Sequence, residues 1–295
     1  MKWKRIWISL WLLTLLAIFI VTLVNHSPYF LLGGSSSVAP VMEELLHNYP
    51  NNHKKGDFNY VSSASSGAPI RVDNDLFAIG WLSKDYTNTN PNLLSFQLMR
   101  DALVIVYNLP NLENPDTPLN FNSETVKQLY LNHKRWDEVF PDQIKSYTPA
   151  KLFTRPNGSG TRDVFDNKVL SGETYYEANT VDSSSAMLNL EPGSIGYTSF
   201  ADINQAKNMR VSSGYWNQKK ATEDNIKNKL YELWRPFTGL LKKNYKYSAE
   251  IAGLLKWIYI ENPPEVEAIF KKYGPRIDIS DPVNNQLQEW LSGWA

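Results

Sequence analysis

The most informative segment of the chain is Lys151-Leu152-Phe153-Thr154-Arg155-Pro156-Asn157-Gly158-Ser159-Gly160-Thr161-Arg162-Asp163. Its first four residues form a short β-rich run, and the residues after it carry apolar side chains at helical spacing, namely Val164, Phe165, Val169 and Leu170. A short strand that passes through a loop into a helix is typical of α/β proteins. The loop is rich in glycine and hydroxyl side chains, so it can direct hydrogen-bond donors at a bound anion.

Two further loops of the same kind occur earlier in the chain. The first is Gly33-Gly34-Ser35-Ser36-Ser37-Val38-Ala39-Pro40, and the second is Ser62-Ser63-Ala64-Ser65-Ser66-Gly67. Taken singly, each loop is explained as a turn or a helix cap. In an open α/β sheet, however, ligands bind beyond the carboxyl ends of the strands, where all three loops are expected to emerge. Three such loops together favour a binding site.

The rest of the chain after Tyr29 alternates short β-rich runs with amphipathic helical segments, which predicts an α/β architecture with mainly parallel strands. Strands are predicted at Tyr29 to Leu32, Phe58 to Val61, Phe77 to Gly80, Ala102 to Tyr107, Lys151 to Thr154 and Ile195 to Thr198. Helices are predicted from Pro40 to Tyr49, after a Ser123 cap to Tyr130, after a Ser248 cap to Tyr259, and from Pro264 to a stop at Gly274-Pro275.

The composition restricts what the site can bind and how. Lys plus Arg equals Asp plus Glu at 30 each, so the chain as a whole has no strong field for nucleic acid or acidic surfaces. Any anion must be held by local groups, and an oxyanion needs a dense array of N–H and O–H donors. The three loops supply such donors, and Arg155 can add a bidentate, charge-assisted contact.

Other classes of function find little support in the sequence. There is no cysteine, which removes thiolate metal sites, disulfides and a lipid-modified N-terminal cysteine. The histidines are His26, His47, His53 and His133, and none adjoins the three loops. A nucleophile elbow, a Walker A motif and a basic stripe are all missing. We therefore predict a protein that is not an enzyme, has no catalytic residue, metal or cofactor, and binds no nucleic acid.

The N-terminus predicts a membrane anchor. Met1-Lys2-Trp3-Lys4-Arg5 precedes a run of about 19 mostly apolar residues, Ile6 to Val24, which is long enough to cross a bilayer as a helix. Basic residues before this run and none soon after it indicate a cytoplasmic N-terminus and an exported remainder. A cleaved signal peptide is the alternative, but no A-x-A pattern follows Val24. The linker from Asn25 to Pro28 spans about 13 Å when fully extended.

The chain resembles the phosphate-binding proteins of bacterial phosphate ABC transporters over nearly everything after Tyr29. The motifs that carry the resemblance are Gly34 to Pro40, Ser65 to Gly67, Ile79-Gly80, Asp101 to Tyr107, Ser123 to Trp136, Gly158-Ser159-Gly160-Thr161-Arg162, Ser194 to Tyr197 and Arg235-Pro236. Gly-Ser-Gly-Thr-Arg at the start of a helix is the most specific of them.

The resemblance implies a fold and a set of contacts. The fold is the α/β, two-lobed type II periplasmic-binding-protein fold, here with an N-terminal transmembrane helix. Residues 1–28 would form the cytoplasmic tip, anchor and linker, 29–104 and the C-terminal helical part 232–295 lobe I, and 105–231 lobe II. Phosphate would lie in the cleft between the lobes, held by Ser36, Ser37, Ser65, Arg155, Ser159, Gly160 and Thr161, with Ser83 as a further contact.

One departure from the family pattern bears on selectivity. Many members carry an aspartate shortly after the Ile-Gly of the third strand, and its carboxylate accepts the proton of hydrogen phosphate. Here the matching position is Ser83, and the usual acid before Ile-Gly is Ala78. Ser83 could accept that proton through its lone pairs, or Asp85 could reach the site if the loop is shifted. An ordinary solvated acid is the alternative for Asp85.

The implied partners follow from this family. We expect a monomeric, single-pass membrane protein whose extracytoplasmic domain captures inorganic phosphate and delivers it to the permease of an ABC transporter. A receptor for another oxyanion, such as sulfate or molybdate, is the first alternative. A tethered anion sensor or scaffold of the same fold is the second, and a scaffold predicts no stabilisation by anions.

Overall fold

The computed structural model describes residues 28–50, 56–87 and 89–294. The strands are β1 (Tyr29–Ser35), β2 (Asp57–Ser63), β3 (Ile79–Leu82), β4 (Leu93–Asn108), β5 (Asn120–Phe121), β6 (Lys151–Thr154), β7 (Asn179–Thr180), β8 (Ser194–Ser199), β9 (Ser212–Ser213), β10 (Tyr215–Trp216) and β11 (Trp234–Lys242). The α-helices are α2 (Ala39–Asn48), α3 (Ala68–Asp73), α4 (Ser123–Tyr130), α5 (Trp136–Val139), α6 (Gly160–Val164), α7 (Phe200–Gln205), α8 (Glu223–Lys227), α9 (Ser248–Lys256), α10 (Pro264–Tyr273) and α11 (Asn285–Ser292). Short helical segments of other types are η1 (Ser65–Gly67), η2 (Phe165–Val169), η3 (Ser185–Asn189), η4 (Trp257–Glu261) and η5 (Pro282–Asn284).

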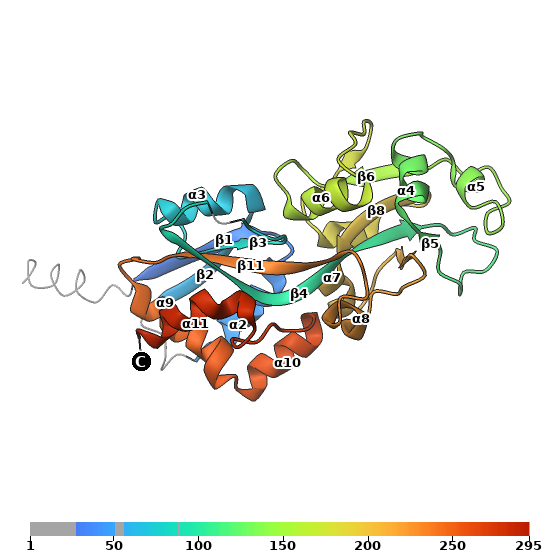
Figure 1. The fold of residues 1–295 in the computed structure, drawn as a ribbon. Coiled ribbons are helices and arrows are strands. Elements are labelled where there is room, and N and C mark those ends of the chain that lie inside the picture. Colours follow the sequence, from blue (N-terminus) through green and yellow to red (C-terminus); the bar gives the residue numbers. More distant parts are fainter. Residues whose placement is uncertain (1–27, 51–55, 88, 295) are drawn as a thin grey trace, which may run out of the picture.

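A continuous sheet runs through both halves of the molecule in the order β2-β1-β3-β11-β4-β8-β6-β7, and β9 pairs with β4. Helices α2, α9, α10 and α11 cover one face of the half that contains β1, β2 and β3, and α3 covers the other face (Figure 1). Helices α4, α5 and α6 surround β6 and β8 in the second half, while β4 and β11 cross from one half to the other (Figure 1).

The strand directions differ in part from the sequence prediction of mainly parallel strands. β1 is parallel to β2 and β3, and β6 is parallel to β8 and β7. The two crossing strands are instead antiparallel to their neighbours, because β11 pairs antiparallel with β3 and β4, and β4 with β8. All six predicted strands are present, but β4 is much longer than predicted and begins at Leu93.

Strand β11 was missed by the sequence analysis. Pro236 lies within it, and a proline normally argues against an interior strand because it cannot donate to the ladder. The structure accommodates Pro236 beside a register shift between Phe237 and Thr238. Gly239 is needed here, because a Cβ at this position would lie 2.3 Å from the Phe96 ring.

Two large apolar clusters form the cores of the two halves. The first combines residues from Phe30 to Met99 with residues from Phe237 to Leu291, and it also includes Ala201. The second runs from Ala102 to Leu233. The sequence therefore passes from the first core to the second within β4 and returns at the start of β11. The predicted α/β, two-lobed fold is confirmed, whereas the lobe boundaries at residues 104 and 232 stay a prediction.

The helices predicted from apolar periodicity are present, with corrections at their starts. Asn122 caps α4 instead of Ser123, since its side chain accepts from the Thr125 N–H. Ser248 is the first residue of α9, and its Oγ donates to the Tyr245 carbonyl at 2.7 Å instead of capping the helix. Helix α10 ends before Gly274, which has a φ of +146°.

The predicted transmembrane helix from Ile6 to Val24 lies outside the described residues. Across residues 28–50, 56–87 and 89–294, no helix has both the length and the apolar character that crossing a bilayer requires.

Candidate functional site

The three polar loops converge at the carboxyl ends of their strands. β1 and β2 are paired so that Ser35 lies opposite Ser63, which places the first two loops side by side. β3 pairs with β1 at Gly34 and Trp81, and this brings Ser83 to the same edge. The third loop, from Arg155 to Ser159, approaches them from the other lobe.

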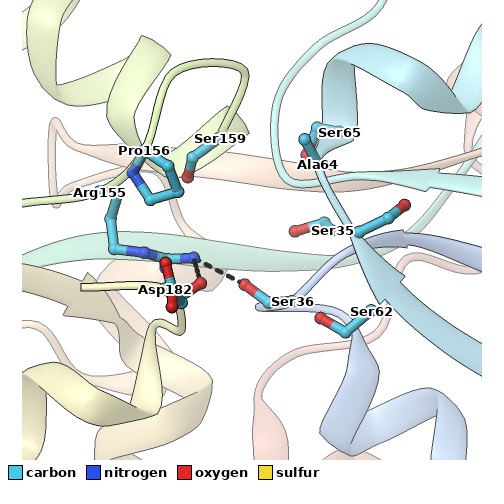
Figure 2. Close-up of a pocket in the computed structure, with 10 residues that line it drawn as sticks. Ser35, Ser36, Ser62, Ala64, Ser65, Arg155, Pro156, Ser159 and Asp182 are labelled. Carbon is cyan, nitrogen blue, oxygen red and sulfur yellow. Dashed lines mark hydrogen bonds between the residues drawn. The ribbon is translucent and has the colours of Figure 1, made fainter. Parts of the chain in front are cut away.

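These loops enclose a pocket of about 100 Å³ between the two lobes. Figure 2 shows Arg155, Pro156 and Ser159 on one side and the serines of the first two loops on the other. The residues that line it are Ser35, Ser36, Ser62, Ser63, Ala64, Ser65, Arg155, Pro156, Ser159 and Asp182. Hydroxyl groups therefore dominate the lining.

Arg155 brings a positive charge into this pocket. Its side chain is buried, and burial lowers the pKa of the guanidinium. Nε donates to the Val181 carbonyl at 3.0 Å, and Nη2 donates to the Asp182 carbonyl at 2.7 Å. Nη1 is buried without a hydrogen-bond partner among the described residues. The guanidinium forms no ion pair with a described carboxylate, so its charge is held by neutral acceptors.

Ser36 and Ser37 connect the first loop to the opposite lobe. Arg155 Nη2 donates to Ser36 Oγ at 2.9 Å (Figure 2). Ser37 Oγ and Thr161 Oγ1 share a hydrogen bond of 3.0 Å, and both side chains are buried. These two hydrogen bonds show that the lobes are closed against each other in this structure.

Ser65, Ser83 and Gly160 meet at a second point of contact between the lobes. The hydroxyls of Ser65 and Ser83 are buried and have no hydrogen-bond partner within the described part of the chain. A Cβ at Gly160 would lie 2.7 Å from Ser83 Oγ and 2.8 Å from Ser65 Oγ. Position 160 must therefore be glycine for the closed lobes to approach this closely.

Ser159 and Gly158 shape the third loop. Ser159 is the N-cap of α6, where its Oγ accepts from the Arg162 N–H at 3.4 Å. The first N–H groups of such a helix have no acceptor within the helix and remain available to a ligand. Gly158 has a φ of +82°, which favours glycine, and its carbonyl accepts from the Ser66 N–H at 3.2 Å.

All eight residues predicted to contact a ligand lie at this junction of the lobes. Arg155, Ser36, Ser65 and Ser159 line the pocket, while Ser37, Ser83, Gly160 and Thr161 lie in the surrounding contacts between the lobes. Their contact with a ligand stays a prediction. Asp85, in contrast, is exposed, does not line the pocket, and accepts from Gln97 Nε2 at 3.3 Å.

A buried charged network lies where the crossing strands pass between the lobes, and the sequence analysis missed it. Arg235 of β11 donates through Nε to Asp101 of β4 at 2.9 Å. Asp101 also accepts from Ser199 Oγ at 2.8 Å, which joins β4 to β8. The sequence does contain a signal for this network, because Asp101 directly precedes the apolar run that begins at Ala102. A charged residue in such a position is rarely buried without a partner.

Asp202 extends this buried region toward the pocket. It is buried, it accepts from Thr198 Oγ1 at 3.2 Å, and burial raises its pKa to about 6. The charges of Asp101 and Arg155 act on it with opposite sign, the first raising and the second lowering the pKa. Within the described residues no cluster of His, Cys, Asp or Glu could hold a metal ion.

A closed, two-lobed α/β fold with a donor-lined pocket between its lobes defines a ligand-binding protein. A profile of the PBP superfamily domain matches residues 25–262. The match covers most of the chain, and the chain therefore belongs to the PBP superfamily.

Comparison with characterised proteins confirms the resemblance noted above. The chain is 23% identical to the phosphate-binding protein PstS of Bacillus subtilis over 208 residues, which is 69% of this chain and 66%, just under two thirds, of that protein. It is 24% identical to PstS of Staphylococcus aureus strain USA300 over 245 residues, 76% of this chain and 72% of that one. Both names describe binding proteins and not enzymes.

Solved structures share the fold. A putative phosphate ABC transporter substrate-binding protein of Clostridium perfringens, solved with bound phosphate, has a TM-score of 0.70 at 21% identity and covers 85% of this chain and all of that one (100%). An ABC-type phosphate transport receptor of Vibrio cholerae has a TM-score of 0.62 at 22% identity and covers 84% of this chain and 99% of that one.

Proposed function

We propose that this chain is an extracytoplasmic receptor that captures inorganic phosphate between its two lobes and carries out no chemistry on it. The sequence relatives are named as phosphate-binding proteins, and a pocket lined mainly by hydroxyl groups lies between the two lobes of this chain. Within the closed structure the pocket presents donors from both lobes, as a small oxyanion requires.

The observation that carries this proposal is the buried, unpaired charge of Arg155. A buried cation is costly unless an opposite charge or several acceptors compensate it. Arg155 Nη1, Ser65 Oγ and Ser83 Oγ are buried and without a hydrogen-bond partner among the described residues. A tetrahedral oxyanion supplies a negative charge and several acceptor oxygens, so it would satisfy all three donors.

The proposed contacts are those that the sequence predicts: Ser36, Ser37, Ser65, Arg155, Ser159, Gly160 and Thr161, with Ser83 as a further contact. Four of these residues belong to predicted lobe I, which consists of 29–104 and 232–295. The other four belong to predicted lobe II, which is 105–231. An anion that contacts both lobes binds the closed form far better than the open form. Binding is therefore coupled to closure about β4 and β11.

The proposed receptor is anchored in the membrane by its N-terminal segment. The apolar run from Ile6 to Val24 would hold the monomeric receptor on the extracytoplasmic side as a single-pass protein, and an ABC transporter permease would receive the phosphate. Extraction of membranes at alkaline pH tests the anchor. We expect the chain to stay in the membrane pellet, and its release into the supernatant would remove the anchor from the proposal.

A receptor for a different oxyanion is the second candidate, and Ser83 favours it. A carboxylate at this position would accept the proton of hydrogen phosphate and repel sulfate, which carries none at neutral pH. A serine hydroxyl both donates and accepts, so it repels neither anion. Asp182 is the acidic residue among those that line the pocket. Its contact with Arg155 is made by its backbone carbonyl, which accepts a hydrogen bond from Nη2.

Calorimetric titration of the full-length chain in detergent decides between these candidates. Phosphate and sulfate are each titrated at pH 6 and pH 8, on either side of the ionisation of dihydrogen phosphate. We expect phosphate to bind at both pH values, and tight binding of sulfate would instead assign the receptor to another oxyanion. Binding of neither anion would indicate a scaffold or sensor of the same fold.

A further inference from the structure

Lys84 and Asp163 form an ion pair that joins the two lobes next to the pocket. Lys84 Nζ donates to Asp163 Oδ2, and both side chains are 32% exposed. Lys84 follows β3 in the first half of the molecule, and Asp163 belongs to α6 in the second. Neither residue lines the pocket.

The backbone of each residue is held in place by a hydrogen bond to a neighbouring element. The Lys84 carbonyl accepts from Thr238 Oγ1 on β11 at 2.9 Å, and the Asp163 N–H donates to the Ser159 carbonyl at 2.9 Å. Lys84 directly follows Ser83, and Asp163 lies three residues after Gly160. Closure of the lobes therefore forms two contacts together: the close approach of Gly160 to Ser83, and the ion pair of Lys84 with Asp163.

We propose that Lys84 and Asp163 act as a latch that sets how long the bound anion stays in the closed cleft. This inference rests on the proposed function. The latch does not touch the anion, so it stabilises the closed form and leaves the anion contacts unchanged. Because the pair breaks when the lobes open, its loss accelerates release and weakens binding by the same factor.

Release of phosphate from the full-length chain, measured by stopped-flow fluorescence, tests the latch. We expect Lys84→Met and Asp163→Asn each to release phosphate about fivefold faster than the unmodified chain, the upper range for a partly exposed ion pair. The double variant should release it no faster than either single variant, because the same interaction is lost. The exchanged pair Lys84→Asp with Asp163→Lys should recover much of the slow release.

The control is an ion pair within one half of the molecule. Lys127 Nζ lies 2.6 Å from Glu173 Oε1, and both residues belong to the second half. Lys127→Met should leave the release rate unchanged. The unfolding free energy of ligand-free Lys84→Met should also match that of the unmodified chain, which distinguishes a latch from a general effect on stability.

Each outcome has a definite meaning. Equal release rates in Lys84→Met and the unmodified chain would overturn the latch and leave the receptor in place. The latch would also be overturned if the effects of the two single substitutions on the release rate were additive in the double variant. The two residues would then act separately. If the unmodified chain bound neither phosphate nor sulfate, the proposed function itself would fail.

Discussion

At the scale of single residues, Arg155 decides the character of the pocket. Its guanidinium donates to two backbone carbonyls and to Ser36, and no described carboxylate pairs with it. Neutral acceptors fix its position without neutralising its charge. Among the described residues the guanidinium takes part in no ion pair, so its positive charge is available to a ligand.

Replacing Arg155 should remove most of the binding free energy that comes from charge. We expect Arg155→Ala to weaken phosphate binding by about 2 kcal/mol or more, because a charge-assisted contact is lost from a desolvated site. Calorimetry measures the change, and Arg210→Ala, at an exposed arginine, serves as the control. Unchanged affinity in Arg155→Ala would show that the third loop does not bind the anion.

Asp202 should make stability depend on pH. Its pKa rises from 3.8 to about 6 on folding, so between these values the folded chain holds a proton that the unfolded chain has lost. The Asp202 contribution is fully present below about pH 4 and is lost as the pH rises through about 6. Asp202→Asn should therefore be about 2 to 3 kcal/mol more stable than the unmodified chain at pH 8 and about equal to it near pH 4.

Urea unfolding at a series of pH values measures this difference. Asp142→Asn, at an exposed carboxylate, is the matched control. A constant offset between Asp202→Asn and the unmodified chain at every pH would mean that Asp202 does not titrate in this range.

At the scale of elements, the loop between β6 and α6 has to approach η1 and the end of β3 very closely. Gly160 provides the space, because a Cβ there would lie within 3 Å of two serine hydroxyls. This restriction exists only when the lobes are closed. The glycine is therefore a requirement of the closed form more than of the folded lobe that contains it.

Gly160→Ala should separate binding from stability. We expect phosphate binding to weaken about tenfold or more, because the added methyl group holds the lobes apart and overpacks the closed junction. The free energy of unfolding of the ligand-free chain should change by less than about 1 kcal/mol. Gly293→Ala, with its nearest contact at 3.5 Å, is the matched control. A large loss of stability with normal affinity would contradict this account.

At the scale of the whole molecule, two cores are joined by two long strands. β11 pairs along its whole length with the first part of β4, from Leu93 to Ala102, and the buried Asp101–Arg235 ion pair lies at the crossing. Breaking a buried pair of this kind costs about 3 to 5 kcal/mol, because one charge is left without a partner. We therefore expect the crossing to stay intact during closure, and the lobes to rotate about it as intact bodies.

Closure can be followed directly, because the chain contains no cysteine. Labels on Asp142→Cys and Asn244→Cys, at exposed positions in the two halves, report the separation of the lobes. We expect saturating phosphate to shorten the mean distance between the labels and to narrow its distribution. The same labels in Arg155→Ala should respond much less, and an identical response would exclude anion binding by Arg155 as the cause of closure.

The α/β class, most of the strands and the residues of the three loops could be predicted from the amino-acid sequence. The prediction was possible because these features depend on local patterns: apolar periodicity, short strands, and glycine and serine directly after them. The similarity to phosphate-binding proteins depends on the same local motifs. These features needed no knowledge of distant contacts.

Which groups face one another across the lobes could be seen only in the folded chain. The unpaired donors of Ser65 and Ser83, the close approach at Gly160, the Asp101–Arg235 pair and the strand β11 all depend on residues far apart in the chain. No local pattern encodes them, because burial and pairing of a polar group are fixed by its neighbours in space. Pro236 even argues against a strand in this segment, which pairs with β3 on one side and β4 on the other.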